Sequence, residues 1–115
     1  MSERRILVVD DDKMIAGFLN ELLTEASYDV RLAHAGQDAL DRLNSAERDE
    51  IDLVLLDVML PDVDGSTMCR RLRASPRTER LLIIMVTGRD KPTEITLGLD
   101  IGADDYLAKP FSPNE

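Results

Sequence analysis

Residues 51–65 read IDLVLLDVMLPDVDG, and this stretch indicates the kind of fold that the chain adopts. It begins with a nearly unbroken apolar run that ends in Asp57, and Pro, Asp and Gly residues typical of a turn follow. A short apolar run bounded by turn signals is typical of a strand that is buried on both faces of a parallel sheet. Just beyond the turn, Met68, Cys69 and Leu72 have helical spacing, so we expect a helix whose apolar face packs into the core.

Similar units extend toward both ends of the chain. Further apolar runs lie at residues 6–9, 28–32, 81–86 and 106–107. Patterns with helical spacing lie between them, at residues 14–23, 39–43 and 95–101, the last of which stops at Gly102. The first of these patterns places Met14, Ile15, Phe18, Leu19, Leu22 and Leu23 on one face. Strands that alternate with helices predict a parallel sheet with helices on both faces.

The composition of each run indicates where its strand lies in the sheet. The runs at residues 6–9 and 81–86 are continuously apolar and the run at 51–56 is nearly so, as expected of central strands. The run at 28–32 alternates apolar and charged residues and the one at 106–107 is short, so both fit the edges. With right-handed crossovers, these positions predict a flavodoxin-like, doubly wound α/β fold with a five-stranded parallel sheet of order 2-1-3-4-5.

Length and charge narrow the classes of function. The 115 residues fit one domain, residues 1–115, and 14 Lys and Arg against 23 Asp and Glu give a net charge of −9. This charge disfavours direct binding to nucleic acid or to an anionic membrane. The single cysteine has no partner for an internal disulfide, which fits a reducing compartment. Without a signal-peptide pattern or an apolar run long enough to span a membrane, we expect a cytoplasmic location.

The last residues have the pattern of a helix start. Ser112, Pro113 and Glu115 match the N-cap, the first helical position and the third helical position. We therefore expect that the fifth helix is cut short and that the sequence is part of a longer protein, in which an added helix would raise stability.

Acidic residues follow two strands at the point where the strand order reverses. Asp10 and Asp11 follow residues 6–9, and Asp57 follows residues 51–56. Ligands of doubly wound sheets bind at this point, beyond the carboxyl ends of the strands. Because three crowded carboxylates resist ionisation without a cation, we expect a hard divalent ion there, and Mg²⁺ fits best. Asp57 is then a candidate nucleophile that forms an acyl phosphate.

The two strands that follow also end in polar residues. Thr87 ends one and can donate a hydrogen bond to a phosphoryl group, and Lys109 ends the other and can neutralise its charge.

Four motifs together resemble a known family. They are VVDDD (residues 8–12), LLDVMLPDVDG (55–65), VTG (86–88) and YLAKPF (106–111). In order and spacing they are similar to the receiver domain of two-component response regulators, the CheY-like family, over residues 6–111. CheY is itself a known example of the strand order given above.

The resemblance implies a role for each matching residue. Asp57 accepts a phosphoryl group from a phosphohistidine of a sensor histidine kinase or a histidine phosphotransfer protein. Asp11 binds Mg²⁺ directly, Asp10 acts mainly through a metal-bound water, and the main-chain carbonyl of Met59 is a further ligand.

Three more implied roles concern the response to phosphorylation. Thr87 and Tyr106 form a switch pair, and Lys109 holds a phosphoryl oxygen. The resemblance also implies a phosphoprotein of signal transduction, in a two-component system or phosphorelay. By the same resemblance, the domain is expected not to be an enzyme with a substrate of its own, although it would assist its own phosphotransfer and dephosphorylation. The phosphorylated state would alter contacts with an output domain or partner protein, and a homodimer is one option.

Two other functions remain open on the residues alone. A Mg²⁺-dependent phosphohydrolase would also use Asp57, but Val58 and Met59 supply no general acid or base beside it. A docking or dimerisation module would need no phosphoryl transfer, and failure to bind Mg²⁺ would favour it.

Some polar residues near the motifs have simpler interpretations. We expect Asp12 to be the N-cap of the first helix and His34 to be a surface or loop residue. The segment Asp62 to Gly65 resembles part of a calcium loop but fits a turn better, and Tyr106 could be a plain edge-strand aromatic.

Overall fold

The computed structural model describes residues 4–57, 60–87 and 103–108. Its strands are β1 (Arg5–Val9), β2 (Asp29–Ala33), β3 (Leu53–Asp57), β4 (Leu82–Thr87) and β5 (Asp105–Ala108). Its helices are α1 (Lys13–Glu25), α2 (Gly36–Leu43) and α3 (Gly65–Ala74), and the 3₁₀ helix η1 (Ala46–Glu50), which no pattern predicted, precedes β3. The helices predicted at residues 95–101 and from Ser112 lie outside the described residues.

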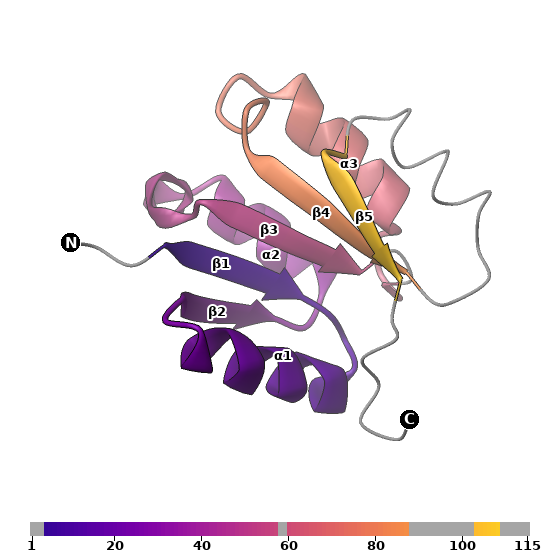
Figure 1. Cartoon of the computed structure of the whole chain (residues 1–115). Helices are drawn as coiled ribbons and strands as arrows, with labels where there is room; N and C mark the ends of the chain where they lie inside the picture. Colours follow the sequence, from indigo (N-terminus) through magenta and orange to yellow (C-terminus); the bar gives the residue numbers. More distant parts are fainter. Residues whose placement is uncertain (1–3, 58–59, 88–102, 109–115) are drawn as a thin grey trace.

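All strands of the sheet are parallel, in the order β2-β1-β3-β4-β5 (Figure 1). The structure confirms the predicted flavodoxin-like fold, the predicted order of the first four strands and the edge position of β2. β5 pairs with β4, where Ala108 lies opposite Thr87. Because β2 and β3 flank β1 on opposite sides, the strand order reverses between β1 and β3. The carboxyl ends of these two strands therefore lie side by side.

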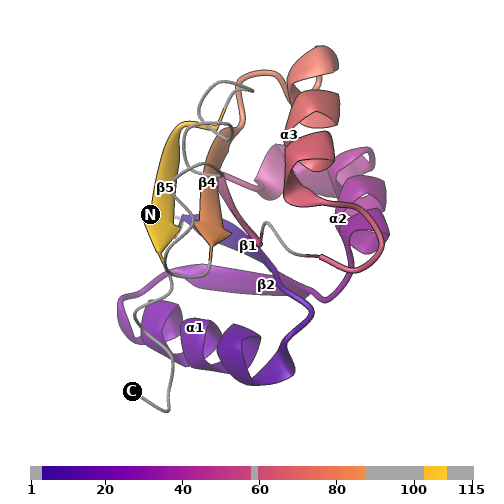
Figure 2. The same ribbon diagram turned by 90° about the vertical axis from the view of Figure 1, so that its right-hand side faces the viewer.

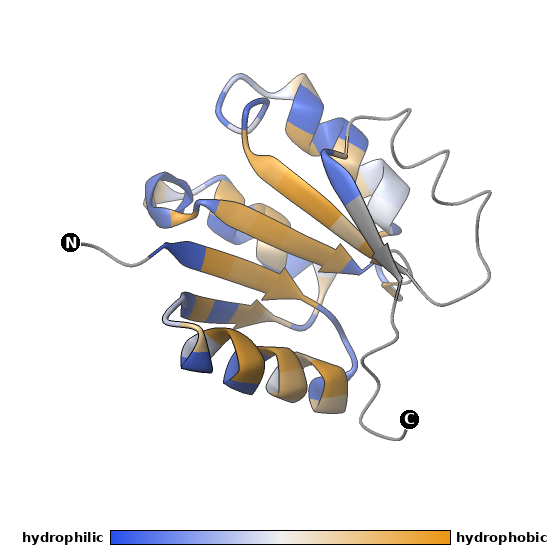
Figure 3. Ribbon diagram, in the orientation of Figure 1, coloured by the Kyte–Doolittle hydropathy of each residue, from blue (hydrophilic) through white to orange (hydrophobic). Residues whose placement is uncertain are grey.

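Helices cover the sheet from both sides. α1 lies on one face, and α2 and α3 lie on the other (Figures 1 and 2). Along β1, Ile6 and Val8 belong to the apolar cluster that includes Leu19 of α1. The alternate residues, Leu7 and Val9, belong to the larger cluster with α2 and α3. Since the side chains on both faces of β1 are buried, this strand is apolar along most of its length (Figure 3).

The apolar face of α1 is narrower than its spacing predicted. Leu19 is only 7% exposed and Ala16 is fully buried, but Met14 is 61% and Leu22 is 49% exposed. Ala16 and Leu19 are the buried residues of α1, and Leu23 is partly buried against the same cluster as Leu19. Met14 and Leu22 lie at the margin of this stripe. An apolar pattern therefore overestimated how much of this helix the sheet can cover.

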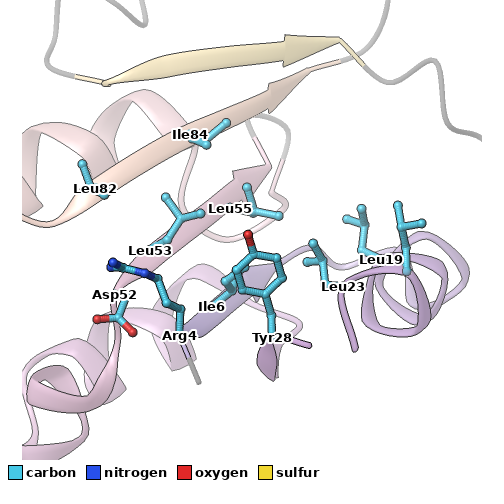
Figure 4. A pocket seen from close by; sticks show the side chains of 11 residues that line it. Arg4, Ile6, Leu19, Leu23, Tyr28, Asp52, Leu53, Leu55, Leu82 and Ile84 are labelled. Atoms are coloured by element: carbon cyan, nitrogen blue, oxygen red, sulfur yellow. The ribbon is translucent and has the colours of Figure 1, made fainter. Parts of the chain in front are cut away.

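An apolar groove lies beside this margin of α1. Its volume is about 390 Å³, and side chains of α1, β1, β3 and β4 line it (Figure 4). Leu82 of β4, at the groove, is 52% exposed, and Arg4 and Asp52 lie together near one end. Within the described residues, this is the part of the sheet that α1 leaves open.

No helix of the described part is long and apolar enough to cross a membrane.

Candidate functional site

The end of β1 holds a buried carboxylate in a defined position. Asp10 is 2% exposed, and its main-chain N–H donates to the carbonyl of Ala33 at the end of β2, at 3.0 Å. The Asp10 side chain accepts a hydrogen bond from the N–H of Asp12 at 2.9 Å. Asp11, the next residue, is exposed. The turn after β1 thus presents one buried and one accessible carboxylate.

The end of β3 brings a third carboxylate to the same place. Asp57 is 4% exposed and is the last residue of β3, where it lies opposite Val86 of β4. One carboxylate oxygen from each of Asp10, Asp11 and Asp57 lies within 4.8 Å of the others. The structure therefore brings together the three aspartates that the sequence predicted as neighbours. The cause is the reversal of strand order between β1 and β3.

The chemistry of this cluster suits a hard divalent cation. Carboxylate oxygens are preferred ligands of Mg²⁺, and the accessible Asp11 beside two buried aspartates leaves one side open to solvent. At such short separation the negative charges repel one another, and a cation between them would offset that repulsion. The residues present thus fit a Mg²⁺ ion.

The remaining predicted site residues are described only in part. Thr87 is the last residue of β4, and Tyr106 lies in β5 opposite Met85. The backbone thus brings the ends of β4 and β5 together one and two strands away from Asp57. Met59 and Lys109 lie outside the described residues.

Two neighbouring polar residues lie where the sequence predicted them, and one of them makes a contact that was not predicted. Asp12 is the N-cap of α1, as expected, and its side chain accepts from the N–H groups of Met14 and Ile15. His34 is an exposed loop residue, as expected, and in addition its ring Nδ1 lies 3.1 Å from the main-chain oxygen of Asp10. This contact joins residues 24 positions apart, so no local pattern could reveal it.

Asp62 also does more than form a turn. Its two carboxylate oxygens accept hydrogen bonds, each 2.9 Å long, from the N–H groups of Gly36 and Gln37. It therefore caps α2 from a different loop, the one that follows β3. These main-chain donors, Gln37 first, hold the pKa of the Asp62 carboxyl below its usual value. The sequence contained no signal for this cap because Asp62 does not directly precede α2, the helix that it caps.

Comparisons with known proteins agree with the motifs and the geometry. Residues 6–115 match the family described as the response regulator receiver domain. Among solved structures, a putative response regulator from Chloroflexus aurantiacus is 39% identical, with a TM-score of 0.88 over 98% of this chain and 90% of that one. The BeF3-activated N-terminal receiver domain of Klebsiella pneumoniae RstA is 33% identical, with a TM-score of 0.83 over 96% and 90%. The chemotaxis response regulator CheY4 of Vibrio cholerae is 28% identical, with a TM-score of 0.86 over 98% and 92%. From its motifs, its fold and this match, the chain belongs to the receiver domain family of response regulators.

Proposed function

We propose that the chain is a phosphoacceptor switch in which Asp57 receives the phosphoryl group. The observation that carries this proposal is the cluster itself. Asp57 is 4% exposed, ends a central strand, and has a carboxylate oxygen within 4.8 Å of carboxylate oxygens of Asp10 and Asp11. A buried acid beside two others is an unfavourable arrangement unless a cation or a reaction uses it. Membership of the family supports the same role, because receiver domains are signalling domains.

Mg²⁺ is the cofactor that this donor set suits. Asp10, Asp11 and Asp57 would hold it, and the family resemblance adds the main-chain carbonyl of Met59. When bound, the ion supplies positive charge that offsets both the carboxylates and the incoming phosphoryl oxygens. The proposal is thus that this cluster is a site for both ion and phosphoryl group.

The proposed reaction needs one nucleophile from this chain. A carboxylate oxygen of Asp57 attacks the phosphorus of a phosphohistidine on the donor protein, a P–O bond forms and the P–N bond breaks. The electron pair of the broken bond returns to the imidazole of the donor. Asp57 then carries an acyl phosphate, which water can later hydrolyse to phosphate and the free carboxylate.

Residues at the ends of β4 and β5 are proposed to read the new charge. Thr87 would donate a hydrogen bond to the phosphoryl group, Lys109 would neutralise an oxygen, and Tyr106 would change position with Thr87. The pairing of β4 with β5 supports this, because it brings the strand that carries Thr87 beside the strand that carries Tyr106. Phosphorylation would shift an existing equilibrium between two conformations.

The proposed partners are a sensor histidine kinase or histidine phosphotransfer protein upstream and an output domain or partner protein downstream. We propose a cytoplasmic location and no direct nucleic-acid contact, since the net charge of −9 disfavours binding to phosphate backbones. A homodimer remains one way in which the output could be produced.

Intact-mass spectrometry after incubation with acetyl phosphate and Mg²⁺ tests this function. We expect one phosphoryl adduct on the wild type, none after addition of EDTA, and none on Asp57→Asn. Asp64→Asn is the matched control, because Asp64 is an aspartate of the following loop whose side chain caps α3 instead. Absence of an adduct on the folded wild type would contradict the proposal and favour a docking module.

A further inference from the structure

The turn between β2 and α2 contacts the acidic cluster through His34. The ring Nδ1 of His34 lies 3.1 Å from the main-chain oxygen of Asp10. A carbonyl oxygen can only accept a hydrogen bond, so Nδ1 must carry the hydrogen and donate it. The side chain of an exposed loop residue thus binds the backbone of a buried acidic one.

This bond is one of two that hold the main chain of Asp10 against the end of β2. The N–H of Asp10 donates to the carbonyl of Ala33 at 3.0 Å, and the carbonyl of Asp10 accepts from His34 at 3.1 Å. Two successive residues of the β2 end therefore hold both peptide groups that flank the Asp10 side chain. The N–H of Asp12 also donates a hydrogen bond, 2.9 Å long, to the side-chain carboxylate of Asp10 and so restrains its orientation. Without the His34 bond, the peptide after Asp10 would lose one of these constraints.

The same turn is also bound to the loop that follows Asp57. Asp62 accepts from the N–H groups of Gly36 and Gln37, which are two and three positions after His34. The turn residues that carry His34 are therefore held by the loop that continues from β3. The main chain from His34 to Gln37 thus links the hydrogen bonds of Asp62 to the hydrogen bond between His34 and Asp10.

We propose that His34 is a positioning residue for the cation-binding Asp10, and that Asp62 positions the turn that carries His34. This inference rests on the proposed function, because it assumes that the aspartate cluster binds Mg²⁺. Groups that orient metal ligands without touching the metal commonly change metal affinity when they are removed. A plain surface histidine would leave that affinity unchanged.

Four variants of the full chain separate positioning from other effects. His34→Ala removes the donor. His34→Asn keeps one, because its side-chain nitrogen is bonded to the same position, Cγ, as the ring Nδ1. Asp62→Ala removes both bonds to the turn. Asp64→Ala is its matched control: it removes the same charge and a helix cap from the same loop, but Asp64 caps α3 through the N–H of Thr67 at 3.0 Å.

The measurements are the Kd for Mg²⁺ by titration calorimetry and the unfolding midpoint in urea with EDTA. We expect the Kd to rise about threefold to tenfold for His34→Ala, somewhat less than the usual range for groups behind a metal ligand. His34→Asn should stay within about twofold of the wild type, since the donor is kept. Asp62→Ala should weaken binding, and Asp64→Ala should lower the urea midpoint without changing the Kd. If Asp62→Ala does not fold, Asp62→Asn should give a smaller loss, because its one oxygen can still accept from one of the two amides.

The outcomes distinguish the inference from the function on which it rests. If the folded wild type binds no Mg²⁺, the proposed function fails and the inference fails with it. If the wild type binds Mg²⁺ but His34→Ala binds equally well, the inference alone is wrong. An equal rise of the Kd for His34→Asn and His34→Ala would also overturn the inference, because the hydrogen-bond donor would then not be the cause. An equal rise for Asp64→Ala and Asp62→Ala would overturn it as well, because the bonds to the turn would then not be the cause.

Discussion

Two glycines of this chain should respond to alanine with opposite signs. Gly36 is the buried first residue of α2, where it lies against the loop after β3. A Cβ built there would lie 3.0 Å from Cβ of Val63, 3.0 Å from Sδ of Met68 and 3.3 Å from Oδ1 of Asp62. Gly17, in the middle of α1, has nothing within 4 Å of such a Cβ. We expect Gly36→Ala to destabilise the protein and Gly17→Ala to stabilise it.

The magnitudes follow from what each new methyl group meets. At position 36, the thioether of Met68 can move, but Cβ of Val63 is fixed to the backbone, so the loop must shift. Overpacking of this kind costs about 1–3 kcal/mol. Ala gains little helix propensity at a first helical position, so we expect a net loss of about 1–2 kcal/mol. At position 17 the propensity gain of about 0.5–1 kcal/mol is unopposed.

Urea unfolding followed by circular dichroism measures both effects. With a slope of about 2 kcal/mol per molar urea, the midpoint of Gly36→Ala should fall by roughly 0.5–1 M, and that of Gly17→Ala should rise by a few tenths of a molar unit. The m-values should stay equal, so that midpoint shifts report stability. If both variants were stabilised alike, the loop would not approach α2 as closely as 3.0 Å, and the reasoning would be wrong.

Two further predictions concern single side chains. Main-chain donors lower the pKa of the Asp62 carboxyl from 3.8, so its contribution to stability is complete above about that pH and is lost as pH falls through the lowered value. Asp62→Asn should therefore lose less stability than the wild type over this acid range in pH-dependent urea titrations, and parallel curves would refute the assignment. Thr78 is 1% exposed and donates from Oγ1 to the carbonyl of Leu72 near the end of α3. Thr78→Val should cost about 1 kcal/mol in thermal or urea unfolding. The control Thr24→Val, at an exposed bond on α1, should stay within about 0.5 kcal/mol, and equal effects would contradict the role of burial.

Much of the fold could be predicted because its causes are local or repeat along the chain. The apolar runs of β3 and β4 identified them as inner strands of the sheet, although Leu82 of β4 is exposed at the groove. The charged residues between the apolar ones of β2 correctly indicated an edge. The burial of Met68, Cys69 and Leu72 likewise followed from helical spacing. The prediction failed where packing against other elements decides burial. Leu22 fits an apolar stripe, yet it is 49% exposed and lines the groove that the described part of the chain leaves open.

The aspartates of the candidate site were predictable for a different reason. Each directly follows a strand, and the order of parallel strands determines which strand ends meet. The prediction that Asp10, Asp11 and Asp57 converge needed only the order 2-1-3, which the structure contains. No such rule exists for His34 or Asp62, since their partners lie on other loops, 24 and 25–26 positions away.

The residues that form the candidate site were therefore predictable, whereas the contacts that hold these residues in place were not. The ends of β1 and β3 bring three negative charges within 4.8 Å, and Coulomb repulsion alone would drive the turns that carry them apart. A compact cluster therefore needs restraints that do not depend on a bound cation. Asp10 donates one such restraining bond to Ala33 and accepts another from His34, and Asp62 accepts bonds from the first N–H groups of α2. Because these restraints act on main-chain groups, they do not themselves occupy the carboxylates of the cluster. Such an arrangement lets a cation bind without first ordering the loops.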